Sequence, residues 1–426
     1  MTVIDHPPLA ESAEPPLAVD MDGTIVAGDT LFEGIVELLR SHPIQWLLMP
    51  VWALAGKASF KARIAERTQL DVEFLPYDAQ VVEHLRAQSG SRELVLCTAA
   101  DHRFAHAVAA HLGFFDSVLA TKDNVNLSAS GKARALVERY GARGFDYAGN
   151  DVPDIEVFSH ARRAIVVNPT PGLKRREATI GNVSQTLKAP SRFPWRGAAH
   201  LRAIRPHQWV KNLLVFVPLL ATINMSSLGG IFPALLAFLS LSLVASGVYL
   251  LNDLIDLRAD RRHPVKRKRP FASGALPIRD GLIMIPALLA AGFATGALIS
   301  PLFLAVLLAY YVCTVFYTFW LKRVVLLDTL VLSGLYTLRI LAGAAAILVI
   351  PSFWLLAFSM FFFLSIALAK RYAELVEHER GPRADTPAGR EYRTEDLTTL
   401  ISQGSASGYA AVLVLALYQV RSVSLR

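Results

Sequence analysis

Long apolar segments in the second half of the chain constrain its fold more than any other feature. Seven of them follow residue 208, and each is close to the roughly 20 residues that an α-helix needs to cross a bilayer. They lie near 209–227, 230–251, 281–299, 301–320, 325–348, 352–369 and 404–420. The sequence therefore predicts an all-α polytopic bundle of membrane helices in residues 201–426. We expect close helix packing at small residues of these segments, namely Gly292, Gly296, Gly334 and Gly343.

Lys and Arg residues cluster in alternate loops of this half. Eight of them lie between Leu257 and Arg279, and more follow at 321–324 and 370–396, whereas the loops near 227, 300 and 350 carry none. The positive-inside rule assigns basic loops to the cytoplasm. We therefore predict a multi-pass protein of the inner (cytoplasmic) membrane, with the N-terminal domain and the active sites on the cytoplasmic side. Since the basic clusters adjoin membrane helices, the net charge of +8 does not indicate a nucleic-acid partner.

Residues 17–185 have the pattern of an α/β domain. Short apolar runs alternate with helical segments, which predicts a doubly wound parallel sheet with ligands at the carboxyl ends of its strands. The first strand is expected within Leu17–Thr24, and the others are expected at Glu93–Cys97, Ser117–Ala120, Asp146–Ala148 and Ala164–Asn168. Residues 1–16 are acidic and Pro-rich, so we expect disorder there and no signal peptide. Residues 186–200 are expected to be a linker.

Two acids, Asp20 and Asp22, follow the first expected strand. Acids at this spacing can divide the work of phosphate ester hydrolysis: one attacks phosphorus, and the other protonates the leaving oxygen and later activates water. The stretch Asp20–Thr24, Thr98 at a strand end, Lys132 in a helix and the stretch Gly149–Asp154 occur in the order of four motifs. On these motifs the domain resembles the haloacid-dehalogenase-like phosphatases.

This resemblance implies a Rossmannoid sheet with a helical cap, and Mg²⁺ as the cofactor. The catalytic residues that it implies are Asp20, Asp22, Thr98 and Lys132. The Mg²⁺ ligands that it implies are Asp20, Asp22, Asp151 and Asp154. Asn150 stands where the family often has Asp, which leaves open a non-catalytic domain that only docks a partner.

The insert at about 30–90 is the expected cap. Its segment Pro43–Leu54 is apolar and Trp-bearing but too short to span a membrane, and it is followed by Lys57, Lys61 and Arg63. Such a segment either lies on an anionic membrane surface or forms the buried core of the cap, and the sequence does not separate the two.

A block of acids followed by cations begins at the end of the second apolar segment. Asp253, Asp256 and Asp260 recur at i, i+3 and i+7, which predicts that they share one helix face beside Asn252. A dense basic run follows at Arg261–Arg269. Acids that hold Mg²⁺ next to cations that hold phosphate suit a diphosphate leaving group.

Together with Arg205–Asn212 and Lys370–Leu375, this block resembles the UbiA superfamily, in its branch of decaprenyl-phosphate phosphoribosyltransferases. The resemblance implies transfer of phosphoribose from phosphoribosyl pyrophosphate to a polyprenyl phosphate, with a role in cell wall biosynthesis. The implied Mg²⁺ ligands are Asn252, Asp253, Asp256 and Asp260. The residues expected to bind substrate are Arg202, Gln208, Lys211, Asn212, Arg261, His263, Lys266, Arg267, Arg269, Arg339, Lys370, Tyr372 and Glu374.

Several alternatives stay open at this point. Arg339, inside an apolar segment, is expected either to bind phosphate or to pair with Asp328 or another acid. Glu374 is expected to complete a metal site or bind ribose, the alternative being a solvated charge. The family usually has nine spans and this sequence has seven apolar segments, so we expect the chain to lack the last hairpin of the family. The presence of both domains in one chain suggests that transfer of phosphoribose is followed by removal of its 5-phosphate.

Two rival functions compete with this one. The first is an aromatic prenyltransferase that uses a prenyl diphosphate and carries a non-catalytic N-terminal domain. The second is a non-enzymatic membrane anchor. The sequence gives neither the length of the lipid nor the oligomeric state.

Overall fold

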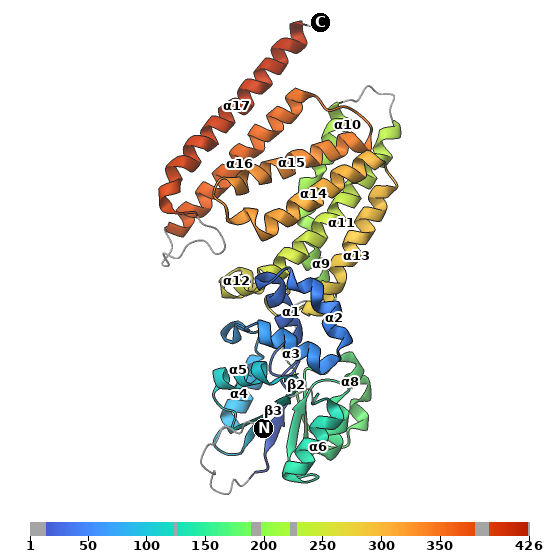
Figure 1. Ribbon diagram of the computed structural model, residues 1–426, viewed down its shortest axis with the longest axis vertical. Coiled ribbons are helices and arrows are strands. Elements are labelled where there is room, and N and C mark those ends of the chain that lie inside the picture. Colours follow the sequence, from blue (N-terminus) through green and yellow to red (C-terminus); the bar gives the residue numbers. More distant parts are fainter. Residues whose placement is uncertain (1–13, 123–125, 189–196, 222–227, 380–391, 425–426) are drawn as a thin grey trace. The chain divides into compact units, whose positions relative to one another are not determined.

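The computed structural model describes residues 14–122, 126–188, 197–221, 228–379 and 392–424. The chain divides into two compact units (Figure 1). The first comprises Met1–His200 together with Asp253–Gly281, and the second comprises Leu201–Asn252 together with Leu282–Arg426. The basic stretch that joins two membrane helices thus packs with the N-terminal unit, which the sequence did not predict.

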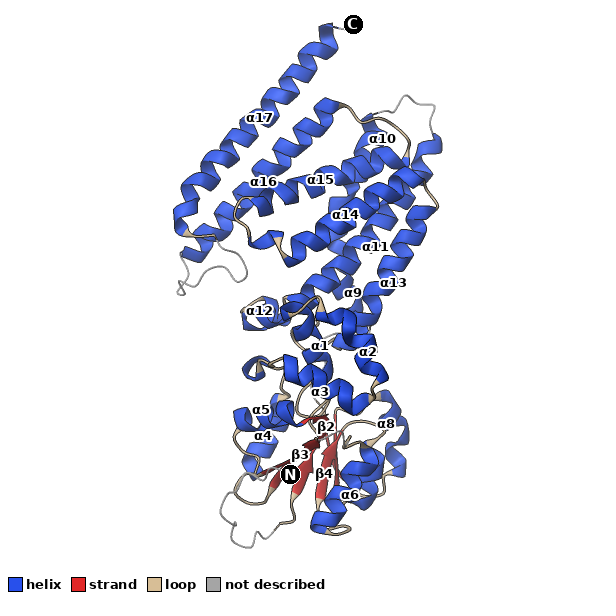
Figure 2. Cartoon of the chain, viewed as in Figure 1, coloured by secondary structure: helices blue, strands red, loops and turns tan. Residues whose placement is uncertain are grey.

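A six-stranded sheet organises the first unit, and all its pairings are parallel (Figure 2). The strands are β1 (Leu17–Val19), β2 (Leu94–Asp101), β3 (Ser117–Thr121), β4 (Asp146–Gly149), β5 (Ala164–Val167) and β6 (Val183–Leu187). Their order is β3-β2-β1-β4-β5-β6, so the order reverses direction between β1 and β4. Ligands of such sheets bind at the carboxyl ends beside this switch point. The predicted α/β fold is confirmed, while β6 was missed because its alternating polar residues lack an apolar run.

Helices cover both faces of this sheet. The helices of residues 14–188 are α1 (Thr30–Ser41), α2 (Met49–Leu54), α3 (Lys57–Arg67), α4 (Ala79–Gln88), α5 (His102–Leu112), α6 (Ala129–Tyr140), α7 (Asp154–His160) and α8 (Pro171–Arg176). On one face α4 and α5 contribute to the core, and on the other α6, α7 and α8 do. Aspartates cap α1, α4 and α5, because the side chains of Asp29, Asp78 and Asp101 accept hydrogen bonds from amides of the first turns. The first four helices form the predicted helical insert between β1 and β2, together with the short 3₁₀ turns at Gln45–Leu48 and Val72–Phe74.

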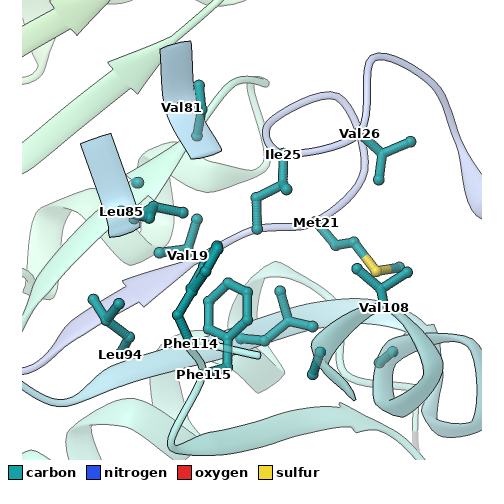
Figure 3. Packing of buried hydrophobic residues seen from close by; sticks show 14 of the residues in the cluster. Val19, Met21, Ile25, Val26, Val81, Leu85, Leu94, Val108, Phe114 and Phe115 are labelled. Carbon is teal, nitrogen blue, oxygen red and sulfur yellow. The ribbon is translucent and has the colours of Figure 1, made fainter. Parts of the chain in front are cut away.

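Alternating side chains of the strands build two separate cores. Val19 and Leu94 point into one cluster, where they meet Phe114 and Phe115 (Figure 3). Ala18 belongs to the other cluster. Because successive side chains of a strand point to opposite faces, burying both faces requires continuous apolar runs such as those of β1 and β5.

The second unit is an all-α bundle. Its helices are α9 (Ala198–Ile204), α10 (Val217–Ala221), α11 (Ile231–Ile255), α13 (Ile278–Ala297), α14 (Pro301–Phe319), α15 (Leu327–Ala346), α16 (Phe353–Glu379) and α17 (Leu397–Ser424), some of which extend past the bounds of the unit. Six helices of the described chain are long and apolar enough to cross a membrane, so the protein is a multi-pass membrane protein. Helices α11 and α15 are the most buried: 61% and 56% of the residues in their apolar 18-residue stretches are buried. They therefore form the centre of the bundle.

The first predicted span, 209–227, is not one long α-helix. Residues Pro206–Phe216 form a 3₁₀-helix, α10 adds five residues, and 222–227 lie outside the described chain. Proline at 206 and 218 removes two backbone donors from this stretch. Six of the seven predicted spans are therefore matched by helices of sufficient length.

Glycines let the helices of the bundle approach closely, as predicted for three of four positions. A Cβ at Gly343 would lie 2.0 Å from the carbonyl oxygen of Val215, and one at Gly292 would lie 2.6 Å from Val244. Gly296 is similarly close to Leu307. The prediction is wrong for Gly334, where no atom of the described chain lies within 4 Å of such a Cβ.

Candidate active sites

The carboxyl ends of β1, β2 and β4 gather the predicted phosphatase residues. Lys132 extends from α6, and its Nζ lies 2.7 Å from Oδ1 of Asp20 and 3.7 Å from Oδ1 of Asp154. Thr98 is fully buried in β2, where its Oγ1 accepts a hydrogen bond from the amide of Ala100. The four motifs thus meet at one point of the sheet, as the sequence predicted.

Asp154 and Tyr147 orient the lysine. The Tyr147 hydroxyl donates to Oδ1 of Asp154 over 2.9 Å and lies 3.2 Å from the Lys132 ammonium. The other oxygen of Asp154 accepts the backbone amides of Asn150 and Asp151. Both carboxylate oxygens of Asp154 therefore already accept hydrogen bonds from groups of the protein. The contribution of Tyr147 was missed, since in the sequence it is one more apolar residue of a strand.

Asn150 packs tightly against the loop of the first motif. Gly23 has a φ of 77°, and a Cβ there would lie 2.2 Å from Nδ2 of Asn150. Any side chain at 23 is therefore excluded by both conformation and space. The neighbouring Asp151 is exposed and accepts a hydrogen bond from the Thr170 hydroxyl over 2.7 Å.

Burial sets the acidity of the first two acids. It raises the pKa of Asp20 to about 6, although the Lys132 ammonium opposes the change. Burial, assisted by the nearby Asp29, raises the pKa of Asp22 to about 8. Burial alone would lower the pKa of Lys132, but Asp20 and Asp154 raise it above its usual value. At neutral pH this arrangement favours one ionised carboxylate and one protonated carboxyl group.

The second acid cluster lies at the end of α11. One Arg269 nitrogen, Nη1, lies 3.1 Å from Asp253 and 2.6 Å from Asp260. The helix is interrupted at Asp256, where α12 (Leu257–Arg262) begins. The prediction that all three carboxylates share one uninterrupted helix face is therefore wrong, but Asp253 and Asp260 still converge on one cation.

Several cations predicted to bind substrate already hold protein partners. Arg261 forms two hydrogen bonds to the carboxylate of Glu33, at 2.6 and 2.9 Å. Nδ1 of His263 accepts the amides of Val265 and Lys266. Arg267 is exposed. Lys266, Asn252 and Asp256 also have interaction partners.

A group of cations gathers in the second unit. Lys211 is affected electrostatically by Lys370, Arg339 and Arg205. Arg205 was not among the predicted substrate-binding residues, and it has a φ of 57° with its guanidinium 5.7 Å from the ring centroid of Tyr249. Like charges brought together in a partly buried place indicate an anion site.

Arg339 is held by neutral groups. It donates to Oδ1 of Asn212 over 2.9 Å and to the Tyr310 hydroxyl over 2.9 Å, and it lies over the rings of Tyr310 and Tyr336. Among described residues no carboxylate lies within ion-pair distance of it. The alternative of a pair with Asp328 is wrong, because Asp328 binds Arg371 and Tyr392 instead.

The remaining predicted residues have mixed surroundings. Glu374 accepts a hydrogen bond from Arg371, 2.5 Å away, while its side chain is 37% exposed, so it is paired and partly solvated. Tyr372 packs against an apolar cluster around Leu368. Gln208 is half-buried at the start of the 3₁₀-helix, and Arg202 is exposed.

Neither acid cluster forms a complete metal cage. Within the described ranges, no group of three or more His, Cys, Asp or Glu side chains is placed to hold a metal ion. Mg²⁺ in phosphate-processing sites is commonly bound by one or two carboxylates, with substrate phosphates and waters as the other ligands. Asp253 and Asp260, which already share one cation, fit that requirement, as does Asp20.

These features define an integral membrane protein with an N-terminal α/β domain built on a parallel sheet. Residues 214–421 match the UbiA prenyltransferase family, and this region of the chain belongs to that family. It is 34% identical over 405 residues to the uncharacterized protein y4nM of Sinorhizobium fredii, covering 95% of this chain and 78% of that protein. It is 41% identical over 227 residues to nodulation protein NoeC of Azorhizobium caulinodans, covering 53% and 73%.

A relative with a named activity matches a shorter part of the chain. The chain is 36% identical over 191 residues to decaprenyl-phosphate phosphoribosyltransferase of Mycobacterium tuberculosis, covering 43% of this chain and 62% of that enzyme. A UbiA homolog from Archaeoglobus fulgidus bound to DMAPP and Mg²⁺ is 17% identical with a TM-score of 0.44, over 51% of this chain and 77% of that one. A haloacid-dehalogenase-like hydrolase from Streptococcus pneumoniae is 16% identical with a TM-score of 0.28, over 41% and 93%.

Proposed function

We propose that the protein transfers 5-phosphoribose from phosphoribosyl pyrophosphate to a polyprenyl phosphate and releases pyrophosphate. The observation that carries this proposal is the cation of Arg269 held between Asp253 and Asp260, beside further arginines. Asp253 and Asp260 would hold Mg²⁺ and Arg269 would bind the oxygens of the diphosphate, so the site would accept both together. The similarity to a named phosphoribosyltransferase supports this choice of donor.

The reaction needs no strong general base. An oxygen of the lipid phosphate is already anionic, so it attacks the anomeric carbon directly while the bond from that carbon to the diphosphate oxygen breaks. Bound Mg²⁺ would neutralise the departing pyrophosphate. We assign the diphosphate to Arg269 and Lys266, on the cytoplasmic side of the membrane.

The acceptor phosphate is assigned to the cation group of the second unit. Lys211 is repelled by Arg339, Lys370 and Arg205, and a bound phosphate would relieve that repulsion. Asn212 holds Arg339 in place through its side-chain oxygen. This assignment explains why a charged residue is tolerated inside an apolar helix.

The N-terminal domain is proposed to remove the 5-phosphate of the lipid product. The Asp20 carboxylate attacks phosphorus and the bond to the ribose oxygen breaks, while Asp22 gives that oxygen a proton. Water, deprotonated by Asp22, then releases inorganic phosphate from Asp20. Lys132 neutralises the phosphoryl oxygens, and Mg²⁺ bound at Asp20 and Asp151 would add positive charge.

The phosphatase step is expected to have a bell-shaped pH dependence. Asp20 must be ionised to attack, so kcat/KM rises as pH increases through about 6 or below, since a bound cation lowers the pKa of that carboxylate. Asp22 must be protonated to act as the acid, so kcat/KM falls as pH increases through about 8. Measuring hydrolysis of ribose 5-phosphate by the full chain from pH 5 to pH 10 checks this. A rate that stays constant above pH 8 would contradict the role of Asp22.

The apolar segment of the cap is proposed to contact the membrane surface. The structure excludes a fully buried core, because Ile44, Leu47 and Leu54 are 81%, 71% and 88% exposed. Only Trp52 of this segment is buried, where Arg67 lies over its ring. Exposed apolar side chains on a short helix suit insertion into the interface.

Replacing Ile44, Leu47 and Leu54 together by serine is expected to test that contact. In vesicles of anionic lipid, phosphatase activity on a lipid-linked substrate should fall by more than about 100-fold, because each of the three side chains loses an apolar burial of roughly 2 kcal/mol and about 1.4 kcal/mol corresponds to a factor of ten. Hydrolysis of ribose 5-phosphate should not change. An equal loss on both substrates would contradict membrane contact and indicate a damaged cap.

A radiolabel assay tests the transferase proposal. Membranes containing the protein are incubated with polyprenyl phosphate and with phosphoribosyl pyrophosphate labelled in the ribose. We expect label in the lipid extract, dependent on Mg²⁺. Label that stays in the aqueous phase would refute the proposal, and transfer from a prenyl diphosphate to an aromatic acceptor in a parallel reaction would favour the rival aromatic prenyltransferase.

A further inference from the structure

The phosphatase acids line a large cavity that the stretch Asp253–Gly281 helps to enclose. The cavity has a volume of about 1790 Å³ and is lined by Asp20 and Lys132 on one side. Arg267, Gly274 and Arg279 of that stretch line it as well. All lining residues belong to the first compact unit. Pockets for drug-sized ligands measure about 300–1,000 Å³, so this one has room for more than ribose 5-phosphate.

One buried ion pair and two partly exposed ones fix this stretch to the cap. The side chains of Arg261 and Glu33 are 8% and 6% exposed and form a bidentate salt bridge. Asp71 accepts hydrogen bonds from Arg258 and Arg262, at 2.8 and 2.7 Å. Because burying charges is costly unless the geometry is good, paired groups of this kind indicate a specific contact.

A close backbone approach brings the stretch next to the first motif. Gly274 has a φ of 72°, and a Cβ there would lie 3.0 Å from the carbonyl oxygen of Ala27 and 3.0 Å from Pro76. Ala27 follows the loop that carries Asp20 and Asp22 and lines the same cavity. Glycine is therefore required at 274 for the stretch to reach this position.

We propose that this stretch is a second wall of the phosphatase site, where Arg267 and Arg279 bind the phosphodiester of a lipid-linked 5-phosphoribose. This inference rests on the proposed function of the domain. Such a substrate has two anionic groups, one on either side of the ribose. The ester phosphate goes to Asp20 and Lys132, and the diester that links the ribose to the lipid needs cations elsewhere in the cavity. Both arginines are exposed and line that cavity.

The assignment makes Arg267 and Arg279 determinants of specificity. Ribose 5-phosphate has no diester, so it gains nothing from the two arginines. A substrate with the diester gains charge-assisted hydrogen bonds from each of them. The wall would therefore select the product of phosphoribosyl transfer over soluble sugar phosphates.

The test measures phosphatase kcat/KM of the full-length protein on three supplied substrates, so that transfer is not required. They are a lipid-linked 5-phosphoribose, a water-soluble methyl phosphodiester of the same sugar phosphate, and ribose 5-phosphate. The double substitution Arg267→Ala and Arg279→Ala should lower kcat/KM about 30-fold for the first two and less than about twofold for the third. The control Lys268→Ala changes an exposed cation of the same stretch that does not line the cavity.

Other outcomes separate this inference from the proposed function. Hydrolysis of all three substrates at equal rates, unaffected by the double substitution, would overturn the inference and leave the phosphatase intact. A preference for the lipid alone, without the soluble diester, would also overturn it, since membrane contact would then explain the preference. Absence of hydrolysis in the unaltered protein would refute the proposed function instead.

Substitution of Gly274 tests the role of the wall without changing either arginine. Gly274→Val forces a side chain against Ala27 and Pro76 and is expected to displace the wall. It should reduce hydrolysis of both diester substrates while ribose 5-phosphate is still hydrolysed. Unchanged selectivity in this variant would overturn the role of the wall.

Discussion

Replacing Asp253 by asparagine is expected to lower phosphoribosyl transfer by about 10³-fold, the largest effect that we predict for the transferase. The substitution keeps the size of the side chain and removes its charge. Asp260 alone would then have to hold both Arg269 and Mg²⁺, so the departing pyrophosphate loses much of its stabilisation. Initial rates of lipid labelling at saturating Mg²⁺ measure the effect.

The matched control is Glu377→Gln, which removes the charge of an exposed acid at the end of α16. It should leave the rate within about twofold, as is usual for surface substitutions. If Asp253→Asn transferred phosphoribose at the unaltered rate, the acid pair would not be the diphosphate site. The non-enzymatic anchor would then be the better account.

Replacing Asp20 by asparagine is expected to abolish the second step, lowering it by at least about 10⁴-fold. The amide does not attack phosphorus, and the ion pair with Lys132 is lost. The 5-phosphorylated lipid should therefore accumulate, while the rate of its formation stays unchanged. Mass spectrometry of the lipid extract distinguishes the two products by one phosphate group.

Glu138→Gln is the matched control for this change, because Glu138 is an exposed acid on α6, the helix that carries Lys132. It should give the same product as the unaltered protein. Accumulation in neither variant, or equally in both, would show that the N-terminal domain does not process this lipid and would favour the non-catalytic reading.

The sequence predicted the parts of the fold that depend on local pattern. Short apolar runs predicted five of the six strands, and the length of the apolar segments predicted six membrane spans. The region 209–227 was predicted wrongly because hydropathy measures apolar length but not backbone geometry, and the stretch at Pro206–Phe216 is a 3₁₀-helix. Likewise, the break at Asp256 is not visible in the spacing of three acids.

The order of the motifs in the sequence predicted which residues lie together in the site. Nothing in the sequence indicated the contacts between residues that are far apart in the chain. Asp20 and Lys132 were placed together correctly, but the contact of Tyr147 with Asp154 depends on tertiary packing. Arg261 was read as a phosphate ligand, since nothing in the sequence links it to Glu33, more than 200 residues away. Charge alone identifies a cation but not its partner.

The central claim is that one chain performs transfer and then dephosphorylation. It is tested most directly by one reaction of the full-length protein with polyprenyl phosphate and doubly labelled phosphoribosyl pyrophosphate, with a carbon label in the ribose and a phosphorus label in the 5-phosphate. The account predicts that the carbon label enters the lipid while the phosphorus label is released as inorganic phosphate. A lipid that retains both labels, or neither, would contradict it.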